Sequence, residues 1–395
     1  MSKHPILRLK PREGWRVRAG APWAFSNEIV LDAGTRSLPP GALVDVEGDD
    51  GRKFGVGYYN ANSLIAVRLF EAPPGTDTDT DFFAARFRHA LALREALFEA
   101  PFYRLVHAEG DRMPGLAVDR FGDSCTVQIT TAGMEAFVDT IVEALEAVIA
   151  PASIVLRADA AARALEGLPS YVRAALGDTP ARIALEENGT RYFADLAGGQ
   201  KTGWYFDQRD NRAFMAALAQ GKSVLDVYCH TGGFALAAAR AGAKEASGLD
   251  SSAPALALAE ETAAANGLRG VCRFVKADAM EELERLGAGR ERFDIVICDP
   301  PPFVRSRKNL ESGARAYRRL ARLAAQVTAP GGFLMLASCS HNMPPDRFRA
   351  ECAAGLARAG SRARLIRDAG ASPDHPVHPL LPETAYLKSL VYAVE

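Results

Sequence analysis

Four aspartates and one cysteine stand where buried strands are predicted to end: Asp226, Asp250, Asp278, Asp299 and Cys339. Carboxylates accept hydrogen bonds from the hydroxyl and amino groups of a nucleotide, and an ionised cysteine is a nucleophile. In an open parallel sheet, ligands bind beyond the carboxyl ends of the strands. The spacing therefore predicts one ligand site at the edge of a sheet.

The segment Ser223–Asp250, SVLDVYCHTGGFALAAARAGAKEASGLD, has the pattern strand, glycine turn, helix and second strand. Gly232 and Gly233 let the backbone turn sharply and approach a ligand, and the following helix offers free N–H groups. Asp250 lies about 20 residues after the turn, where an acid can bind ribose hydroxyls. The absence of GxGxxG disfavours NAD. We predict a nucleotide-cofactor cradle, the alternative being an ordinary αβ turn.

The segment Phe293–Phe303, FDIVICDPPPF, runs a buried strand into an acid and three prolines. Proline fixes φ and lacks an N–H, so this loop should hold the Asp299 carboxylate and the Pro300 carbonyl in place. Hydrogen bonds with the edge of a planar base are its predicted use. The alternative is a proline stop after a strand, with a solvated Asp299.

The segment Leu334–Met343, LMLASCSHNM, places Cys339 at a strand end, flanked by Ser338, Ser340 and His341. A free thiol has a pKa of ~8.5, so a nucleophilic cysteine needs surroundings that favour its thiolate. The alternative is a small buried core residue.

Basic side chains cluster in two segments. Six lie in the first twenty residues, interleaved with Trp15, and seven lie in Phe303–Arg322. Such clusters can pair with RNA phosphates, although solvated edge strands and helix faces look the same in sequence. The residues that we expect to contact RNA are Lys10, Arg12, Arg305, Arg307, Lys308, Arg315 and Arg318.

Three domains are predicted to position these residues. Residues 1–72 alternate short strands, including 24–30, with turns, which is typical of a small β-barrel. Residues 73–196 show an α+β pattern that ends in a hairpin at Asn188-Gly189. Residues 197–395 alternate strands and helices, which predicts a doubly wound α/β domain. The segment Gly198–Arg212 either caps the next helix through Asp207 or forms a lid over the cofactor.

Composition restricts the class of protein. The 47 Lys and Arg residues balance 48 Asp and Glu residues, so any nucleic-acid surface must come from local clusters. Six cysteines without a CxxC pair indicate neither a metal site nor a disulfide framework. Without a signal peptide or a long apolar run, we expect a cytoplasmic protein with no membrane contact.

The whole chain resembles the class I S-adenosylmethionine-dependent 23S ribosomal RNA cytosine-C5 methyltransferases with an N-terminal PUA domain. The resemblance rests on several motifs in family order: GAPWAFSNEI, PPGALVDV, GVGYYNANSLIAVR, AEGDRMPGLAVDRFG, GQKTGWYFDQRDNR, DVYCHTGGFA, CDPPPF, SCSHNM and DHPVHPLLPETAYLK. It implies a PUA-like β-barrel, a central α+β domain and a C-terminal Rossmann-like methyltransferase domain.

The resemblance implies S-adenosyl-L-methionine as cofactor, with Asp226 and Thr231–Gly233 at its methionine part, Asp250 at its ribose and Asp278 at its adenine. The residues implied to bind it are Gln200, Lys201, Thr202, Gly203, Asp207, Arg209, Asp226, Tyr228, Thr231, Gly232, Gly233, Asp250, Ser251, Asp278, Ala279, Asp299 and Pro300.

The resemblance also implies a covalent mechanism. Cys339 would add to C6 of cytosine, so that C5 can attack the sulfonium methyl, while Asp299 would stabilise charge near N3. The sequence does not identify the base that removes the C5 proton. The target cytosine must be unpaired or flipped out. The implied partner is 23S ribosomal RNA, in the large subunit or its precursor, and Ala-rich helices would support a homodimer.

Some residues depart from the family pattern. Cys229, His230 and Pro302 replace the usual residue types, and Cys298 precedes Asp299, whereas other RNA C5-methyltransferases place a second cysteine after the proline. Two alternative functions stay open. One is methylation of an exocyclic amino group, which needs no cysteine, and the other is a non-catalytic ribosome-assembly factor that binds S-adenosylmethionine.

Overall fold

The chain folds into two compact units. The computed structural model describes residues 3–199 and 202–395, so the predicted cofactor residues Gln200 and Lys201 lie outside the described residues. The first unit contains Met1–Ile183, Asp195–Trp204 and Pro373–Thr384. The second contains Ala184–Ala194, Tyr205–Ser372 and Ala385–Glu395. No described helix is both long enough and apolar enough to cross a membrane.

A five-stranded sheet in the order β1-β3-β4-β5-β2 begins the first unit. Its strands are β1 (Ile6–Arg8), β2 (Trp23–Ala24), β3 (Ala42–Glu47), β4 (Lys53–Tyr59) and β5 (Val67–Ala72), with two short helices, α1 (Trp15–Arg18) and α2 (Ala33–Ser37). The strand predicted at 24–30 is wrong beyond Ala24. The 3-10 turn η1 (Ser26–Glu28) follows, because Glu28 Oε2 accepts the Phe25 N–H at 2.7 Å.

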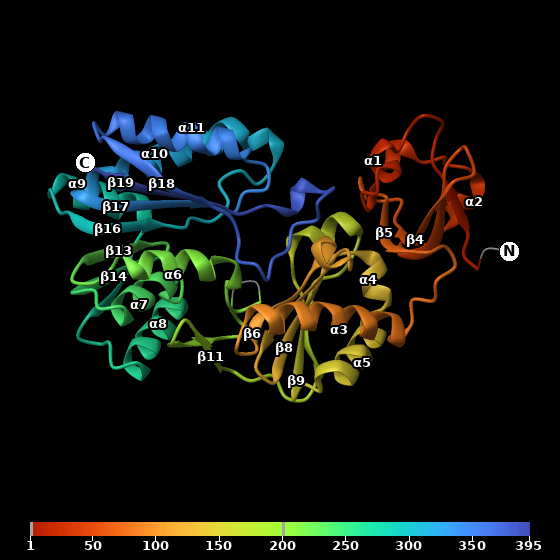
Figure 1. The fold of residues 1–395 in the computed structure, drawn as a ribbon, viewed down its shortest axis with the longest axis horizontal. Helices are drawn as coiled ribbons and strands as arrows, with labels where there is room; N and C mark the ends of the chain where they lie inside the picture. The colour runs from red at the N-terminus through yellow and green to blue at the C-terminus, as the bar shows by residue number, and fades with distance from the viewer. Residues whose placement is uncertain (1–2, 200–201) are drawn as a thin grey trace. The chain divides into compact units, whose positions relative to one another are not determined.

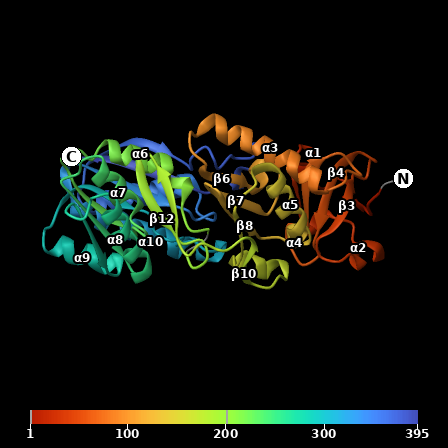
Figure 2. The same ribbon diagram turned by 90° about the horizontal axis from the view of Figure 1, so that it is seen from below.

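A second five-stranded sheet, in the order β10-β9-β8-β7-β6, completes the first unit. Its elements are α3 (Thr80–Leu97), β6 (Phe102–His107), β7 (Leu116–Phe121), β8 (Ser124–Ile129), α4 (Ala132–Ala136), α5 (Val138–Ile149), β9 (Ser153–Ala158) and β10 (Tyr171–Leu176). Helices α3 and α5 lie side by side and pack apolar side chains against the sheet (Figures 1 and 2). Tyr58 and Phe70 of the first sheet belong to the same apolar cluster.

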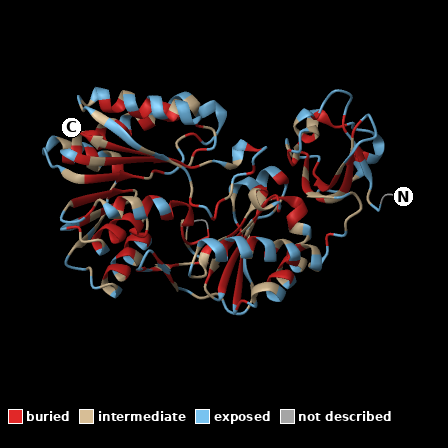
Figure 3. Cartoon of the chain, in the orientation of Figure 1, coloured by how far each residue is buried: buried red, intermediate tan, exposed pale blue. Residues whose placement is uncertain are grey.

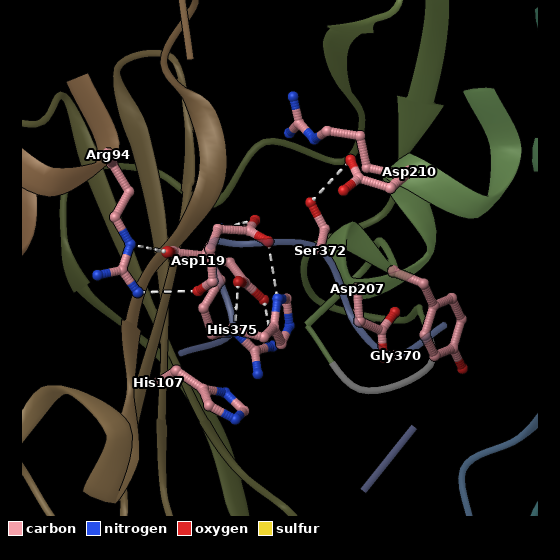
Figure 4. A network of polar contacts seen from close by, with 12 residues as sticks. Arg94, His107, Asp119, Asp207, Asp210, Gly370, Ser372 and His375 are labelled. Carbon is pink, nitrogen blue, oxygen red and sulfur yellow. Dashed lines mark hydrogen bonds and ion pairs between the residues drawn. The ribbon is translucent and has the colours of Figure 1, made fainter. Parts of the chain in front are cut away.

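The segment Pro373–Thr384 is held by a buried polar cluster of the first unit. The Arg94 side chain is fully buried and donates to both Asp111 carboxylate oxygens at 2.6 and 2.7 Å, and to the Asp374 carbonyl at 2.8 Å. His375 Nδ1 lies 2.8 Å from Asp374 Oδ1, and its ring lies 4.8 Å from the His107 ring (Figure 4). These contacts anchor the segment to α3 and to the end of β6.

The second unit is built on a seven-stranded sheet in the order β15-β14-β13-β16-β17-β19-β18. Its strands are β13 (Ser223–Val227), β14 (Glu245–Asp250), β15 (Cys272–Lys276), β16 (Phe293–Cys298), β17 (Thr328–Ser338), β18 (Ala363–Ala369) and β19 (Lys388–Val394). Strands β13 to β17 pair in parallel, whereas β19 is antiparallel to both of its neighbours. The chain winds outward from β13 in both directions, so the carboxyl ends of β13 and β16 border the ligand crevice expected of such a sheet.

Helices cover both faces of this sheet, as Figure 1 shows. The helices are α6 (Arg209–Ala217), α7 (Gly233–Arg240), α8 (Ala253–Ala265), α9 (Ala279–Ala288), α10 (Leu310–Val327) and α11 (Pro345–Arg358). Leu225 and Val227 point toward α9, α10 and α11, while Val224 points toward α6 and α7. The central strand β13 is buried along its whole length and β16 is buried from Ile295 to Cys298 (Figure 3), as expected of strands covered on both faces, which confirms the doubly wound fold.

The predicted hairpin before this unit's first helix is confirmed. Strands β11 (Ile183–Glu187) and β12 (Thr190–Ala194) pair with each other. Asn188 and Gly189 both have positive φ, 51° and 71°, as a type I′ turn requires. Helix α10 begins at Leu310, so Arg315, Arg318 and Arg319 of the basic cluster lie within its first three turns.

The close packing of α10 on α11 depends on Gly355. A Cβ at Gly355 would lie 2.6 Å from both Ala321 Cβ and the Arg318 carbonyl oxygen. We expect Gly355→Ala to destabilise the protein by about 1–3 kcal/mol, because α10 and α11 must move apart.

Gly287→Ala in α9 is the control, since its Cβ would meet only Gln326 atoms at 3.9 and 4.0 Å. This control should be neutral or stabilise by up to ~1 kcal/mol. Urea unfolding midpoints measure both, and equal midpoints for the two variants would contradict the packing argument.

Candidate active site

A tight turn follows β13 and leads into α7. Tyr228, His230 and Gly232 all have positive φ, at 65°, 50° and 77°. A Cβ on Gly232 would lie 2.8 Å from the Phe274 ring, so glycine is required there. Left-handed backbone at two non-glycine residues is costly and is concentrated at ligand sites in proteins. Thr231, Gly232 and Gly233 are buried at the amino end of α7, the end of a helix that favours anionic groups of a ligand.

Asp226 is the buried acid beneath this turn. Its Oδ2 accepts the Ala235 N–H at 3.0 Å, and its Oδ1 has no hydrogen-bond partner among the described residues. Burial raises the pKa of Asp226 to about 7; the Ala235 hydrogen bond opposes the shift, and the carboxylates of Asp299 and Asp250 add to it. The predicted acids at the ends of β13, β14 and β16 therefore lie close to one another. A ligand that brings a cationic or N–H donor would satisfy Asp226.

Asp250 and Asp278 are oriented by backbone donors. Asp250 Oδ2 accepts the His230 N–H at 2.9 Å, and Oδ1 accepts the Ser252 N–H at 2.8 Å, with Ser251 exposed between them. Asp278 is exposed and caps α9, where Oδ1 accepts the N–H groups of the residues two and three positions later at 2.9 and 3.0 Å. Ala279 follows it, buried.

Cys339 lies against the Asp-Pro loop. Its Sγ is 4.0 Å from the Pro300 carbonyl oxygen. The Asp299 N–H donates to the Val227 carbonyl at 3.3 Å, which joins this loop to the end of β13. Ser340 Oγ accepts the Val304 N–H at 3.2 Å. The structure thus brings together the candidate nucleophile and the candidate base-binding acid.

The Tyr317 hydroxyl supports both loops from α10. It accepts a hydrogen bond from Ser338 Oγ at 2.8 Å and shares another with Ser340 Oγ at 2.8 Å. Ser338, Ser340 and Tyr317 are all buried. The two serines that flank Cys339 are therefore fixed by side-chain hydrogen bonds, and Cys339 between them stays partly exposed.

The Gly198–Arg212 segment divides between the two units. In the second unit, Gln208 and not Asp207 is the N-cap of α6, so the alternative in which Asp207 caps this helix is wrong. Asp207 instead accepts the Tyr386 hydroxyl at 2.5 Å, while its carbonyl accepts the Ser372 N–H at 2.9 Å. Arg209 is buried, with Nε 3.8 Å from Glu187 Oε2.

Thr202 and Gly203 belong to the first unit and are buried there. Thr202 Oγ1 has no hydrogen-bond partner among the described residues, and Gly203 has φ 105°. Arg157 holds this segment, donating to the Leu196 carbonyl at 3.0 Å and to the Gly199 carbonyl at 2.9 Å.

Two residues that the sequence did not single out lie at the site. Burial raises the pKa of the Tyr205 hydroxyl, and the neighbouring acids Asp299 and Asp207, Cys339 and Asp250 raise it further, so Tyr205 stays a neutral donor. Lys388 of β19 donates to the Ser340 carbonyl at 2.7 Å. The available signal was a lysine directly before the apolar run that ends the chain, in the segment KSLVYAV.

The predicted RNA-contacting residues differ in their partners. Lys10 is exposed and donates to the Asn27 carbonyl at 2.7 Å, and Arg12 is exposed with φ 64°. Arg318 is partly buried and paired with Glu351 at 2.5 Å. The remaining four side chains are exposed and form no ion pair with a described residue: Arg305, Arg307, Lys308 and Arg315.

Comparison with known proteins places these features in a family context. Residues 7–72 match a PUA-like domain, and residues 169–392 match an S-adenosylmethionine-dependent methyltransferase. Ribosomal RNA large subunit methyltransferase I of Shewanella denitrificans is 37% identical over 393 residues, which cover 98% of this chain and 99% of the relative.

Solved structures show the same fold across the whole chain. A "putative sam-dependent methyltransferase from Streptococcus mutans" has a TM-score of 0.83 at 21% identity and covers 99% of this chain and 100% of that chain. A "putative methyltransferase complexed with SAH" has a TM-score of 0.85 at 21% identity, with the same coverage. The cofactor is S-adenosylmethionine. The glycine turn, the unsatisfied Asp226 oxygen and the fixed Asp250 carboxylate fit its amino and ribose groups. Among the described residues, no group of three His, Cys, Asp or Glu side chains could hold a metal.

Asp226 should make stability depend on pH in the absence of ligand. Its folded-state pKa of about 7 exceeds the ordinary value of 3.8, so its stabilising contribution is full at low pH and is lost as pH rises toward 7. We expect Asp226→Asn to be more stable than the wild type at pH 8. That advantage should shrink by on the order of 2 kcal/mol at pH 5, where both folded states are neutral. Urea titrations of the two proteins at both pH values test this, and a difference independent of pH would contradict it.

Proposed function

We propose, because the chain belongs to the S-adenosylmethionine-dependent large-subunit ribosomal RNA methyltransferases that carry a PUA-like domain, that it methylates C5 of a cytosine in 23S ribosomal RNA. The observation that carries the proposal is the 4.0 Å contact between Cys339 Sγ and the Pro300 carbonyl. It supports a thiol and an acid, Asp299, acting on the same base. The work would take place in the cytoplasm, on the large subunit or its precursor.

Cys339 is the nucleophile of the proposed reaction. Its thiolate forms a bond to C6, and the electrons of the C5–C6 double bond make C5 nucleophilic. A protonated Asp299 carboxyl donating to N3 would stabilise the charge that develops on the ring. S-adenosylmethionine supplies an electrophilic methyl group and leaves as S-adenosylhomocysteine. Loss of the C5 proton to a base then breaks the S–C6 bond and restores the thiolate.

Cys298 does not fit the role of that base. Its side chain is fully buried in the core beneath α10, and burial raises its pKa well above the ordinary value of a thiol. It packs among the apolar side chains between the sheet and helices α9, α10 and α11. The covalent mechanism therefore uses one cysteine of this chain.

The cofactor assignments belong to the same proposal. Asp226 and the turn Thr231–Gly233 would hold the methionine part, Asp250 the ribose and Asp278 the adenine amino group. The support is geometric: Asp226 has an unsatisfied buried oxygen, and Asp250 is held in one orientation by two backbone donors. The remaining predicted cofactor residues, including Gln200 and Lys201, stay part of this proposal.

Cys339→Ala should abolish 5-methylcytosine formation. The assay measures transfer of labelled methyl from S-adenosylmethionine to undermethylated 23S ribosomal RNA, followed by nucleoside analysis. We expect a loss of more than about a thousandfold, because no other group supplies the covalent bond to C6. Cys272→Ala, which removes a partly buried thiol of β15, is the control and should keep full activity. Label in an exocyclic amino group, or unchanged activity of Cys339→Ala, would replace the proposal by the amino-methyltransferase alternative.

Arg307→Ala/Lys308→Ala should weaken RNA binding without changing binding of S-adenosylmethionine. Both side chains are exposed and form no ion pair with a described residue, so they are available to phosphates. Losing two phosphate contacts should reduce the slope of log affinity against log salt by about 1.4 for single-stranded RNA.

The matched control is Arg285→Ala, an exposed arginine already paired with Glu282 and Glu291. Filter binding at several salt concentrations measures all three proteins. If Arg285→Ala loses as much RNA affinity and as much salt dependence as the double variant, the assignment of Arg307 and Lys308 to the RNA-binding surface is contradicted.

A further inference from the structure

Lys388 is a buried cation at the nucleophile loop. It lies at the start of β19, opposite Ser338 of β17, and its residue is 7% exposed. Its Nζ donates to the carbonyls of Ser340 at 2.7 Å and Met343 at 3.1 Å. Among the described residues, no carboxylate forms an ion pair with it. These two carbonyls belong to the loop that carries Cys339.

Burying a lysine without a carboxylate partner is unfavourable. Burial lowers the pKa of Lys388 to about 8, and Cys339 is the titratable group that opposes this lowering. The attraction between opposite charges is mutual. A Cys339 thiolate favours the protonated form of Lys388, and the Lys388 ammonium equally favours the thiolate form of Cys339. The unfavourably buried Lys388 ammonium is therefore held next to the loop of Cys339, whose thiolate the proposed reaction requires.

Several other titratable groups lie near Cys339. Tyr317 reaches it from α10 and Tyr205 from the segment before α6. Asp299 precedes Pro300, whose carbonyl contacts Cys339 Sγ, and His341 stands two residues after Cys339. Burial raises the pKa of both tyrosine hydroxyls, so they are neutral at physiological pH, and a carboxyl such as Asp299 carries no positive charge in either of its forms. The exposed His341 ring stacks on Tyr386 at 5.2 Å. Lys388 is the buried group whose charge favours the thiolate.

We propose that Lys388 is a positioning residue that fixes the Cys339 loop through two carbonyls and, by its charge, favours the thiolate form of Cys339. The ammonium keeps its three protons, and the thiol proton passes to solvent. This inference rests on the proposed function for its purpose, since a thiolate is what attacks C6. The ionisation of Cys339 is nevertheless measurable without RNA, cofactor or methyl transfer.

The test separates charge from hydrogen bonding with two variants. Lys388→Gln keeps N–H donors for the carbonyls but has no charge, whereas Lys388→Arg keeps both. The rate of Cys339 alkylation by iodoacetamide is measured from pH 5.5 to 9.5 by mass spectrometry of the Cys339 peptide, with Cys339→Ala as the blank. The midpoint of the rate profile gives the thiol pKa.

We expect the wild-type profile to have its midpoint below the ordinary thiol value of ~8.5. Lys388→Gln should raise the midpoint, and alkylation at pH 6.5 should slow about tenfold if the thiol pKa rises by about 1. Lys388→Arg should restore most of the wild-type rate. A folded Lys388→Gln variant with the wild-type profile would overturn the charge role. So would variants that lose rate equally at every pH.

Two further outcomes keep this inference distinct from the proposed function. Near-ultraviolet circular dichroism shows whether Lys388→Gln folds. If it does not, a wild-type thiol midpoint at or above ~8.5 overturns the inference. A wild-type midpoint below ~8.5 that Lys388→Arg keeps supports it. If Cys339→Ala still forms 5-methylcytosine while the alkylation profile depends on Lys388, the proposed function fails and the inference stands.

Discussion

The geometry of the site depends on the hydrogen bonds of the Tyr317 hydroxyl. This hydroxyl joins Ser338 at the end of β17 to Ser340 in the following loop, and Ser340 in turn binds the backbone of Val304 beyond the Asp-Pro loop. A buried hydroxyl network of this kind is favourable only when every member is satisfied. Cys339 and Asp299 come from segments about forty residues apart, so their relative position depends on α10 packing correctly against the sheet.

Two ionisable groups at the site are buried at a cost in stability. Asp226 keeps a carboxyl oxygen without a protein partner among the described residues, and Lys388 keeps an ammonium with only carbonyl acceptors there. Neither arrangement would be favoured in a core that served packing alone. Asp226 lies near the carboxyl end of β13, and Lys388 pairs with Ser338 at the carboxyl end of β17, where a ligand or a reacting thiol can use the charge. The same region holds left-handed backbone at Tyr228 and His230, which is a further local cost.

Much of the second unit was predictable because its strands are short, apolar and buried on both faces. The ends of β13, β14 and β16 were located from such runs, and the confirmed hairpin from Asn188-Gly189. What sequence reasoning missed depends on contacts distant in sequence. Lys388 becomes a site residue only because β19 pairs with β17, and Asp207 loses its predicted cap role because Tyr386 binds its carboxylate. The division into three domains, and the role of each cofactor residue, stay predictions.

The place of β19 in the sheet has a consequence for how the protein is made. This strand lies between β17 and β18, although both precede it in the chain. During translation, β17 leaves the ribosome without a partner on one side and β18 without any partner in the sheet, until residues 388–394 follow. Until then the nascent second unit presents the unpaired edges of β17 and β18, which are sites of mispairing and aggregation. Because Lys388 is the first residue of β19, the pairing of that strand completes the sheet and the surroundings of Cys339 in the same folding step.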